Sequence, residues 1–424
     1  MRGGGGGENF RPRFRPRVFP QKRHVDDTFT PHTSMHAYAP PLALGASPSA
    51  APSRFRGVSS SRGSVRPLRA VASVSSATKL EGEALATYMS VMSDDLSRLF
   101  TTGIDKSLYA PNVSFEDPLT TYDTIDGYLF NISMLKNVFD PVYTMHSIAQ
   151  TGDWEVSTRW TMAMSLPTVP FFWAPSLTFT GTSVMGIDPD TKQVTKHFDT
   201  WDAISQQGFF MNTGSTQGVA EVMRQVLDIT KQPALETPQY VVLRRYAEYE
   251  VRRYDPFLVA ETRTNSNDED QGDRLGAGGM TGLPAGGNPF GTLAGYLFGG
   301  NEEKKSMAMT TPVFTGGGKM QFVMPKSVGG VGNAPAPNDP AAVAVTEQPG
   351  GVFAAIRFAG IATDAYAKER EDKLLQLLGK DELVADKNVP ASLAQYNDPL
   401  TNPVQRRNDV LVKLQSFDVG RLDK

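Results

Sequence analysis

The basic and acidic residues of this 424-residue chain are distributed unevenly along it. This distribution limits which part of the chain can fold around a packed core. Residues 1–79 carry 13 Lys and Arg against 3 Asp and Glu, whereas residues 80–424 carry 29 against 42. The basic head is also rich in Ser, Ala and Pro, a composition typical of segments without a packed core. We therefore expect a folded, acidic body only beyond about residue 80.

The basic head has the composition of an organellar targeting segment. It is nearly free of acids and lacks the apolar core of a secretory signal. Residues 65–72 (VRPLRAVA) resemble a stromal processing site of the algal type. We expect residues 1–72 to be a disordered chloroplast transit peptide, and the protein to reside in the chloroplast stroma or at a plastid lipid body. A basic arm that binds RNA or a membrane surface is the alternative.

Composition excludes several classes of protein. An acidic body lacks the basic surplus that displaces counterions from nucleic acid, so no nucleic-acid partner is expected. The most apolar stretch, residues 162–179, contains three prolines, so we expect no transmembrane segment and at most peripheral association with plastid membranes or lipid bodies. With no cysteine, the chain has no disulfide, thiolate metal site or cysteine nucleophile. The sequence does not indicate protein partners.

The first part of the body has the pattern of one helix followed by a sheet. Apolar residues recur at helical spacing at Leu85, Met89, Met92, Leu96 and Leu99. Aromatic-rich extended runs follow at 142–149, 154–165, 177–188 and 194–204, separated by turn residues. A helix followed by a long antiparallel sheet predicts an α+β domain.

Three passages of this block carry a family resemblance: residues 108–118 (LYAPNVSFEDP), 126–128 (DGY) and 197–202 (HFDTWD). Residues 82–206 resemble the small NTF2-like domain of the DUF2358 kind, which implies a cone with an internal pocket. His197, Asp199 and Trp201 alternate on one predicted strand and are the candidates for that pocket. A histidine and a carboxylate at this spacing could form a general acid/base couple. A hydrogen-bonded core trio is the alternative.

Residues 207–236 are expected to hold a linker helix, from 218 to about 231, ended by Pro233. Strands are predicted at 240–245, 249–253 and 257–263. Two later stretches, 265–288 and 326–351, are rich in Gly, Pro, Asn or Ala, and we expect both to be disordered insertions.

Four ordered passages carry a second resemblance: residues 249–254 (YEVRRY), 290–301 (FGTLAGYLFGGN), 307–313 (MAMTTPV) and 396–403 (YNDPLTNP), the last followed by RRNDV at 406–410. Residues 237–424 resemble the SOUL heme-binding family. The resemblance implies a duplicated antiparallel β-barrel with two flanking helices. It also implies binding of heme or a related tetrapyrrole rather than catalysis.

The residues themselves also indicate a duplication. Two strands, a helix at 290–298 and a strand at 307–314 are followed by a strand at 352–359, a helix at 364–378 and a strand at 410–415. Such paired halves can fold a twisted sheet into a barrel with two helices against it. The cleft between helix and sheet edge suits a flat apolar ligand.

A porphyrin is a planar hydrophobe with two carboxylates on one edge, so its site needs apolar walls and a few cations. The candidate wall residues are Phe290, Leu293, Ala294, Tyr296, Leu297, Met307, Met309, Val313 and Tyr396. The candidate cations for the propionates are Lys304, Lys305, Arg406 and Arg407. The alternatives are an ordinary helix-to-sheet core for the walls and, for the arginines, a pair that lies against acids of its own domain.

Iron ligation is the point where the chain departs from most heme proteins. No histidine or cysteine lies between Trp201 and Lys424, so a methionine, a tyrosine, a lysine or no residue would hold the iron. We expect reversible, noncovalent binding, buffering or transport of heme or another tetrapyrrole without His or Cys ligation, and no separate metal site. A small-molecule enzyme using the NTF2-like pocket and a ligand-free interaction protein of plastid lipid bodies are the alternatives.

Overall fold

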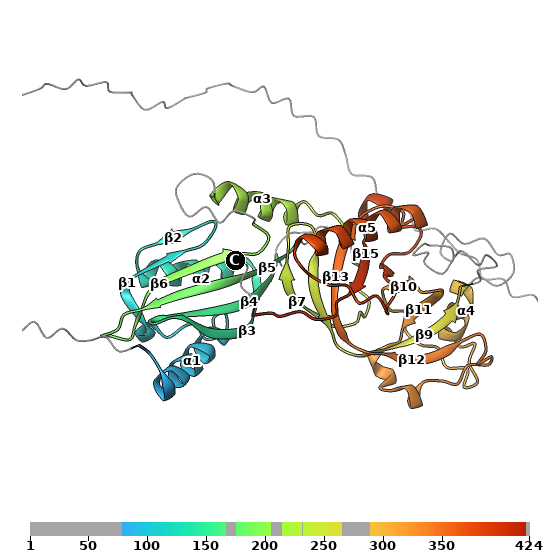
Figure 1. Cartoon of the computed structure of the whole chain (residues 1–424). Coiled ribbons are helices and arrows are strands. Elements are labelled where there is room, and N and C mark those ends of the chain that lie inside the picture. The colour runs from blue at the N-terminus through green and yellow to red at the C-terminus, as the bar shows by residue number, and fades with distance from the viewer. Residues whose placement is uncertain (1–78, 167–174, 205–213, 231, 265–288, 421–424) are drawn as a thin grey trace, which may run out of the picture. The chain divides into compact units, whose positions relative to one another are not determined.

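The computed structural model describes residues 79–166, 175–204, 214–230, 232–264 and 289–420. The predicted transit peptide at 1–72 and the predicted insertion at 265–288 lie outside these residues. The described residues form two sheets with helices packed on them, shown in Figure 1. The α+β class predicted from the sequence is therefore confirmed.

The first sheet has six strands in the order β2-β1-β6-β5-β4-β3. The strands are β1 (Tyr109–Glu116), β2 (Thr121–Tyr122), β3 (Asp140–Gly152), β4 (Glu155–Ser165), β5 (Ser176–Ile187) and β6 (Val194–Trp201). Helix α1 (Gly82–Ser97) contacts β3, and α2 (Ile125–Val138) contacts β1 and β3. A short 3-10 turn, η1 (Lys106–Leu108), precedes β1.

Helix α2 and one strand pairing were not predicted. Thr124 caps α2 by accepting a hydrogen bond from the Gly127 backbone N–H, and the helix buries Ile125, Tyr128, Asn131 and Ile132. Strand β1 runs parallel to β6, whereas the other neighbours in this sheet are antiparallel. The sheet is therefore mixed rather than purely antiparallel, because α2 and the long hairpins lie between β1 and β6 in the chain.

The predicted linker helix is present as α3 (Gly214–Val226), which begins and ends earlier than the sequence indicated. It contacts β5, and Gln225 fixes this contact. The Gln225 side chain accepts from the Thr178 N–H at 2.7 Å and donates to the Thr178 carbonyl at 3.1 Å. The side chain thus satisfies the backbone groups of Thr178 where β6 no longer reaches along β5.

The second sheet has nine strands in the order β12-β9-β11-β10-β14-β15-β13-β8-β7. The strands are β7 (Tyr240–Arg245), β8 (Glu250–Tyr254), β9 (Phe257–Arg263), β10 (Val313–Gly316), β11 (Lys319–Val323), β12 (Ala344–Gln348), β13 (Gly351–Phe358), β14 (Ser392–Gln395) and β15 (Asn408–Lys413). Helix α4 (Pro289–Leu297) follows β9 and helix α5 (Asp364–Lys380) follows β13. Short 3-10 turns are η2 (Lys326–Val328), η3 (Val331–Asn333) and η4 (Pro403–Gln405).

The predicted duplication appears as a repeated topology. The strand order β12-β9-β11-β10 on one side of the sheet matches β8-β13-β15-β14 on the other, and the two halves join where β10 pairs with β14. Each half carries its helix at the corresponding connection. The strand order ends at β12 and at β7, so the curled sheet is an open half-barrel rather than a closed barrel.

The prediction that 326–351 is disordered was wrong. Strand β12 pairs with β9 along its whole length, and Val328 and Val343 are buried in the core beneath α4. The glycines of this stretch serve turns, and Gly329 has a φ of +76°. The Gly, Pro and Ala content of the whole segment concealed the few apolar residues, such as Val328 and Val343, that anchor it in the core.

One predicted strand also begins later than expected. The sequence indicated a strand over 307–314, whereas β10 begins at Val313. Pro312 has no backbone N–H for a ladder hydrogen bond, so regular pairing starts at the residue after it.

Candidate functional site

The predicted wall residues on and after α4 form a packed core. Leu293, Tyr296 and Leu297 are buried with Met307 and Val313 in one cluster, and Phe290, Ala294 and Met309 pack against it. The Tyr296 hydroxyl donates to the Pro335 carbonyl at 2.8 Å. Tyr396 is not part of this cluster and lies in a second one with Tyr254, Phe314 and Leu411.

The predicted propionate cations fall into two places. Lys304 and Lys305 are exposed in the loop after α4, which Asn301 holds by donating to the Lys305 carbonyl and accepting from its N–H. Arg406 donates from Nε to the Thr401 carbonyl at 2.8 Å. Arg407 is buried directly before β15, where it contacts Tyr396 rather than α4.

Arg407 belongs to a group of charges on β7, β8 and β13 and at the start of β15 that sequence reasoning missed. Asp409 is fully buried and accepts from Arg252 and Arg407, each at 2.7 Å, while the Nε of Arg357 lies 3.6 Å away. Glu250 accepts from Arg252 at 2.8 Å and also pairs with Arg245. We call Arg245, Arg252, Arg357, Arg407, Glu250 and Asp409 the arginine cluster. Alternation along β8 and β15 places these residues on one face, but the sequence does not show that the two strands flank β13.

The arginines set the protonation of their acidic partners. Burial raises the pKa of Asp409, but Arg407, Arg252 and Arg357 outweigh it and hold that pKa far below its usual range. The pKa of Glu250 is lowered in the same way, against burial, mainly by Arg252 and Arg245. Both acids are therefore carboxylates at neutral pH.

Aromatic rings surround the arginine cluster. The Arg407 guanidinium lies 4.0 Å from the centroid of Tyr396, and that of Arg252 lies 4.8 Å from the centroid of Tyr240. Arg407 also donates to the Tyr240 hydroxyl at 3.2 Å. Burial raises the pKa of Tyr240, but Arg252 and Arg407 outweigh burial and lower it. The rings contribute cation–π contacts that keep the guanidinium groups in place.

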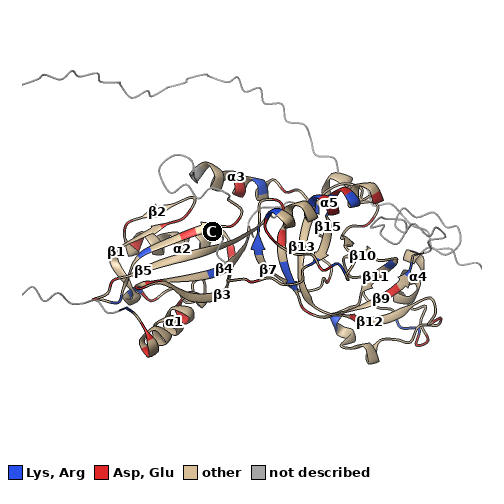
Figure 2. Cartoon of the chain, viewed as in Figure 1, with Lys and Arg blue, Asp and Glu red and all other residues tan. Residues whose placement is uncertain are grey.

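A cleft of about 940 Å³ borders the arginine cluster. Its walls come from β7, β8 and β13, from Arg224 and Gln225 near the end of α3, from residues 228–230 and Gln232 beyond that helix, and from the first residues of β5. Figure 2 shows basic residues on β7 and its neighbours. The volume lies at the upper end of the range of about 300–1,000 Å³ typical of small-molecule sites.

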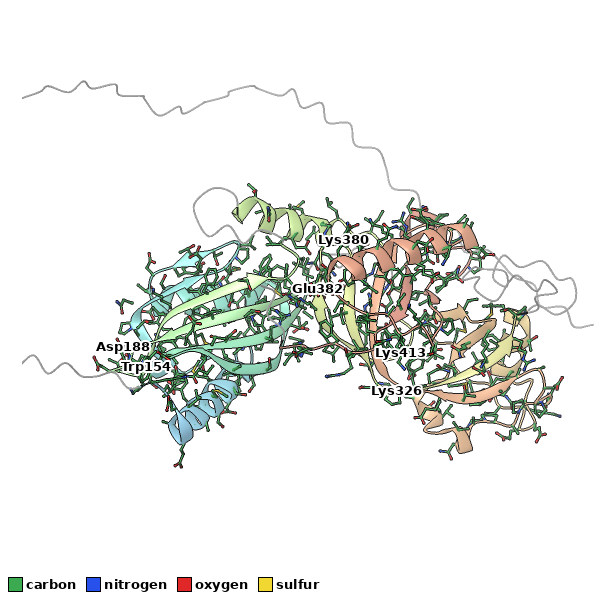
Figure 3. The ribbon with its side chains drawn as sticks, viewed as in Figure 1. Trp154, Asp188, Lys326, Lys380, Glu382 and Lys413 are labelled. Atoms are coloured by element: carbon green, nitrogen blue, oxygen red, sulfur yellow. The ribbon has the colours of Figure 1, made fainter. Side chains whose placement is uncertain are left out.

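A smaller cavity of about 140 Å³ is lined by Glu382, which Figure 3 shows just after Lys380 at the end of α5.

Two members of the predicted trio of the six-stranded sheet, His197 and Asp199, are joined by two further side chains. His197 Nε2 lies 3.1 Å from Asp199 Oδ1, which also accepts from the Ser183 hydroxyl at 2.5 Å. Trp160 Nε1 in turn donates to Ser183 at 2.9 Å. Trp201 stacks on Phe179 instead, with ring centroids 4.3 Å apart. Trp160 lies on β4 and Ser183 on β5, so no sequence spacing could have linked them to His197 on β6.

The hydrogen-bonded group of Trp160, Ser183, Asp199 and His197 is surrounded by apolar and aromatic side chains. His197 lies edge-on to Phe115 and Tyr128, at 5.3 and 5.2 Å between centroids. Burial, helped by the charge of Asp199, raises the pKa of Asp117 to about 6, a value suited to proton transfer near neutral pH. Neither of the two cavities described above is lined by any of these residues.

Two whole-chain properties bear on cofactor and membrane binding. Among the described residues, no group of three or more His, Cys, Asp or Glu side chains could hold a metal ion. No helix in the described part of the chain is long and apolar enough to cross a membrane.

Comparison with known families agrees with both resemblances seen in the sequence. Residues 235–413 match the family model described as SOUL heme-binding protein, and residues 86–197 match that of an uncharacterized conserved protein, DUF2358. The two matches follow one another along the chain in the order that the two resemblances predicted. No curated protein matches the chain significantly.

Several solved structures are similar to part of the chain. An NTF2-like protein of unknown function from Exiguobacterium sp. 255-15 is 15% identical over 28% of this chain and 98% of its own, with a TM-score of 0.22. An LEH-like epoxide hydrolase from M. tuberculosis is 14% identical over 33% and 96%, with a TM-score of 0.23. A putative hydroxylase from Streptomyces galilaeus, AclR, is 11% identical over 27% and 89%, also with a TM-score of 0.23. Similarity at this level says nothing about function.

Proposed function

We propose that this protein binds heme or a related tetrapyrrole noncovalently and reversibly in the chloroplast, where it buffers or transports the ligand rather than transforming it. The observation that carries the proposal is the match of residues 235–413 to the SOUL heme-binding family. The acid-poor, basic head supports the location, and import of the chain into isolated chloroplasts tests it. Peripheral contact with plastid membranes or lipid bodies fits the same proposal.

The residues present suit a tetrapyrrole in two respects. The ligand needs apolar or aromatic surface for its ring and cations for its carboxylates, and the SOUL domain offers both. The α4 stripe from Phe290 to Leu297, with Lys304 and Lys305 nearby, remains our proposed ring site. Ring entry there requires Leu293 and Leu297 to separate from Met320 and Phe322, with which they now share a core.

Iron would add redox chemistry and a coordination bond if the ligand is heme. The two histidines among the described residues, His146 and His197, are both in the DUF2358 domain, and each hydrogen-bonds to a neighbouring side chain. We therefore propose that binding depends little on axial ligation and that metal-free porphyrins bind comparably.

Titration of the full chain with hemin and with metal-free protoporphyrin IX tests the proposal. Both should quench tryptophan fluorescence, hemin should show a shifted Soret band, and the two dissociation constants should agree within about tenfold, a difference of 1.4 kcal/mol. Absence of binding by both ligands would contradict the proposed function. A low-spin spectrum of the bis-nitrogen type, with weak binding of the metal-free ring, would contradict the part on ligation.

A further inference from the structure

The cleft beside the arginine cluster has a polarity that the sequence did not suggest. Arginines and acids occur there as pairs, and two of the more exposed arginines contact an acid that lies deeper. The Arg357 side chain is 33% exposed against 0% for Asp409, and Arg224 is 45% exposed against 6% for Glu221. The cleft therefore presents guanidinium groups to its interior and keeps their counter-charges beneath them.

Two buried acids fix the positions of arginine side chains before any ligand binds. Asp409 and Glu250 fix the positions of Arg357 and Arg245, so a bound anion would not have to order flexible side chains. Arg357 uses Nη1 for Asp228, at 3.1 Å, and its buried Nε faces Asp409, whose Oδ1 lies 3.6 Å away. The guanidinium is thus held by two acids, and its planar fork of N–H groups is suited to a carboxylate.

The rest of the cleft wall is suited to an amphipathic ligand. Tyr240, Tyr246 and Phe358 contribute ring surface, and Ile229 and Val242 contribute aliphatic surface. Two acids of the wall, Asp228 and Glu248, remain at least partly exposed, and each is paired with a cation, Arg357 and Lys373 on α5 respectively. An aromatic wall next to outward-facing arginines matches a flat molecule with carboxylates on one edge.

We propose that this cleft receives the carboxylate edge of a tetrapyrrole, with Arg357 and Arg245 as the groups that bind its propionates. The inference rests on the proposed function but changes its place in the fold. The ring would lie on the aromatic wall of this cleft rather than in the α4 stripe, and the propionates would meet Arg357 and Arg245 rather than Lys304 and Lys305. The ligand class is a planar apolar ring with two free carboxylates, with or without a metal.

The test compares protoporphyrin IX with its dimethyl ester, which keeps the ring and removes both charges. The full chain should bind the acid roughly tenfold to a hundredfold more tightly than the ester, the factor expected for a charge-assisted hydrogen bond. Arg357→Gln should reduce this acid-to-ester ratio towards one. Arg357→Lys should restore part of it, because it keeps the charge but loses the planar fork. The double variant Lys304→Gln/Lys305→Gln is the matched control and should leave the ratio unchanged.

The ratio is measured in a single preparation, so partial unfolding of a variant affects both affinities alike. Should Arg357→Gln fail to fold, Arg245→Gln provides the same measurement. An acid-to-ester ratio near one in the unaltered protein overturns the inference while leaving the proposed function intact. Loss of the ratio in the double lysine variant, with Arg357→Gln unaffected, also overturns it and places the carboxylates at α4. Absence of binding by acid and ester alike contradicts the proposed function itself.

Discussion

The two sheets of this protein bury polar side chains in different ways. In the six-stranded sheet, Trp160, Ser183, Asp199 and His197 form a line of hydrogen bonds within an aromatic core. In the nine-stranded sheet, four arginines and two acids form a network that borders a cleft of about 940 Å³. Both arrangements satisfy buried polar groups, but the arginine cluster also has space in front of it.

This difference separates a structural role from the binding role that we propose for the cleft. A buried hydrogen-bonded line fixes the packing of β4, β5 and β6 and needs no ligand to explain it. Charged side chains in a half-open cleft lose part of their hydration, and their ion pairs offset that free-energy cost only in part. Such arrangements are typical of sites that bind charged ligands. The contrast predicts distinct effects of substitutions in the two sheets.

The largest effect is expected from Asp409→Asn in the nine-stranded sheet. The change leaves Arg252 and Arg407 buried without their shared counter-charge, so the free energy of unfolding should fall by about 3–5 kcal/mol. Urea denaturation followed by circular dichroism measures it. Asp372→Asn, at an exposed ion pair with Lys368 on α5, is the control and should cost less than about 1 kcal/mol. Equal losses in the two variants would mean that the arginine cluster stabilises nothing.

The pH dependence of the same cluster has a defined sign. The pKa values of Asp409 and Glu250 are lowered on folding, so their contribution is present above about pH 4, near the unfolded values, and is lost as the pH falls below it. The difference in unfolding free energy between the unaltered chain and Asp409→Asn should therefore shrink in acid. A constant difference down to pH 3 would contradict this assignment.

A smaller effect is expected from Asp199→Asn in the six-stranded sheet. The variant weakens the hydrogen bonds from Ser183 and His197 and should cost about 1–3 kcal/mol of unfolding free energy, while hemin affinity stays unchanged. Asp190→Asn in the exposed turn before β6 is the matched control. If hemin affinity falls with Asp199→Asn and not with the control, the six-stranded sheet holds part of the ligand site and the comparison drawn above fails.

The smallest effect concerns His146 on β3. Burial, with the charges of Arg159 and Arg253, lowers its pKa to about 4, so the folded state favours the neutral ring. The unfolded state takes up a proton below about pH 6.5, and stability should therefore decline as the pH falls from 6.5 towards 4. His146→Gln can keep the hydrogen bond to Thr161 and should show a shallower decline in urea midpoint between pH 7 and pH 5. An identical decline would assign the acid sensitivity to other groups.

Local patterns in the sequence were enough to predict several elements. Strands β7 and β9 and the start of α5 at Asp364 agree with the predicted boundaries, because alternation, helical spacing and the Thr363 cap act over a few residues. Helix α2 was missed because its apolar residues are not confined to one face, as the exposed Phe130 and Val138 show, and because Gly127 lies in its first turn. The segment 326–351 was misjudged because two buried valines and one strand outweigh a glycine-rich composition.

The sequence by itself determined the families, the α+β class and the absence of His and Cys ligands from the SOUL domain, because these depend on residue identity and order. The tertiary structure alone decided which side chains meet. Arg252, Arg357 and Asp409 are far apart in the chain, and they join because β13 lies between β8 and β15 in the sheet. The same pairing places the fully buried Asp409 beneath the partly exposed Arg357, and that depth gives the cleft the polarity from which its ligand is inferred.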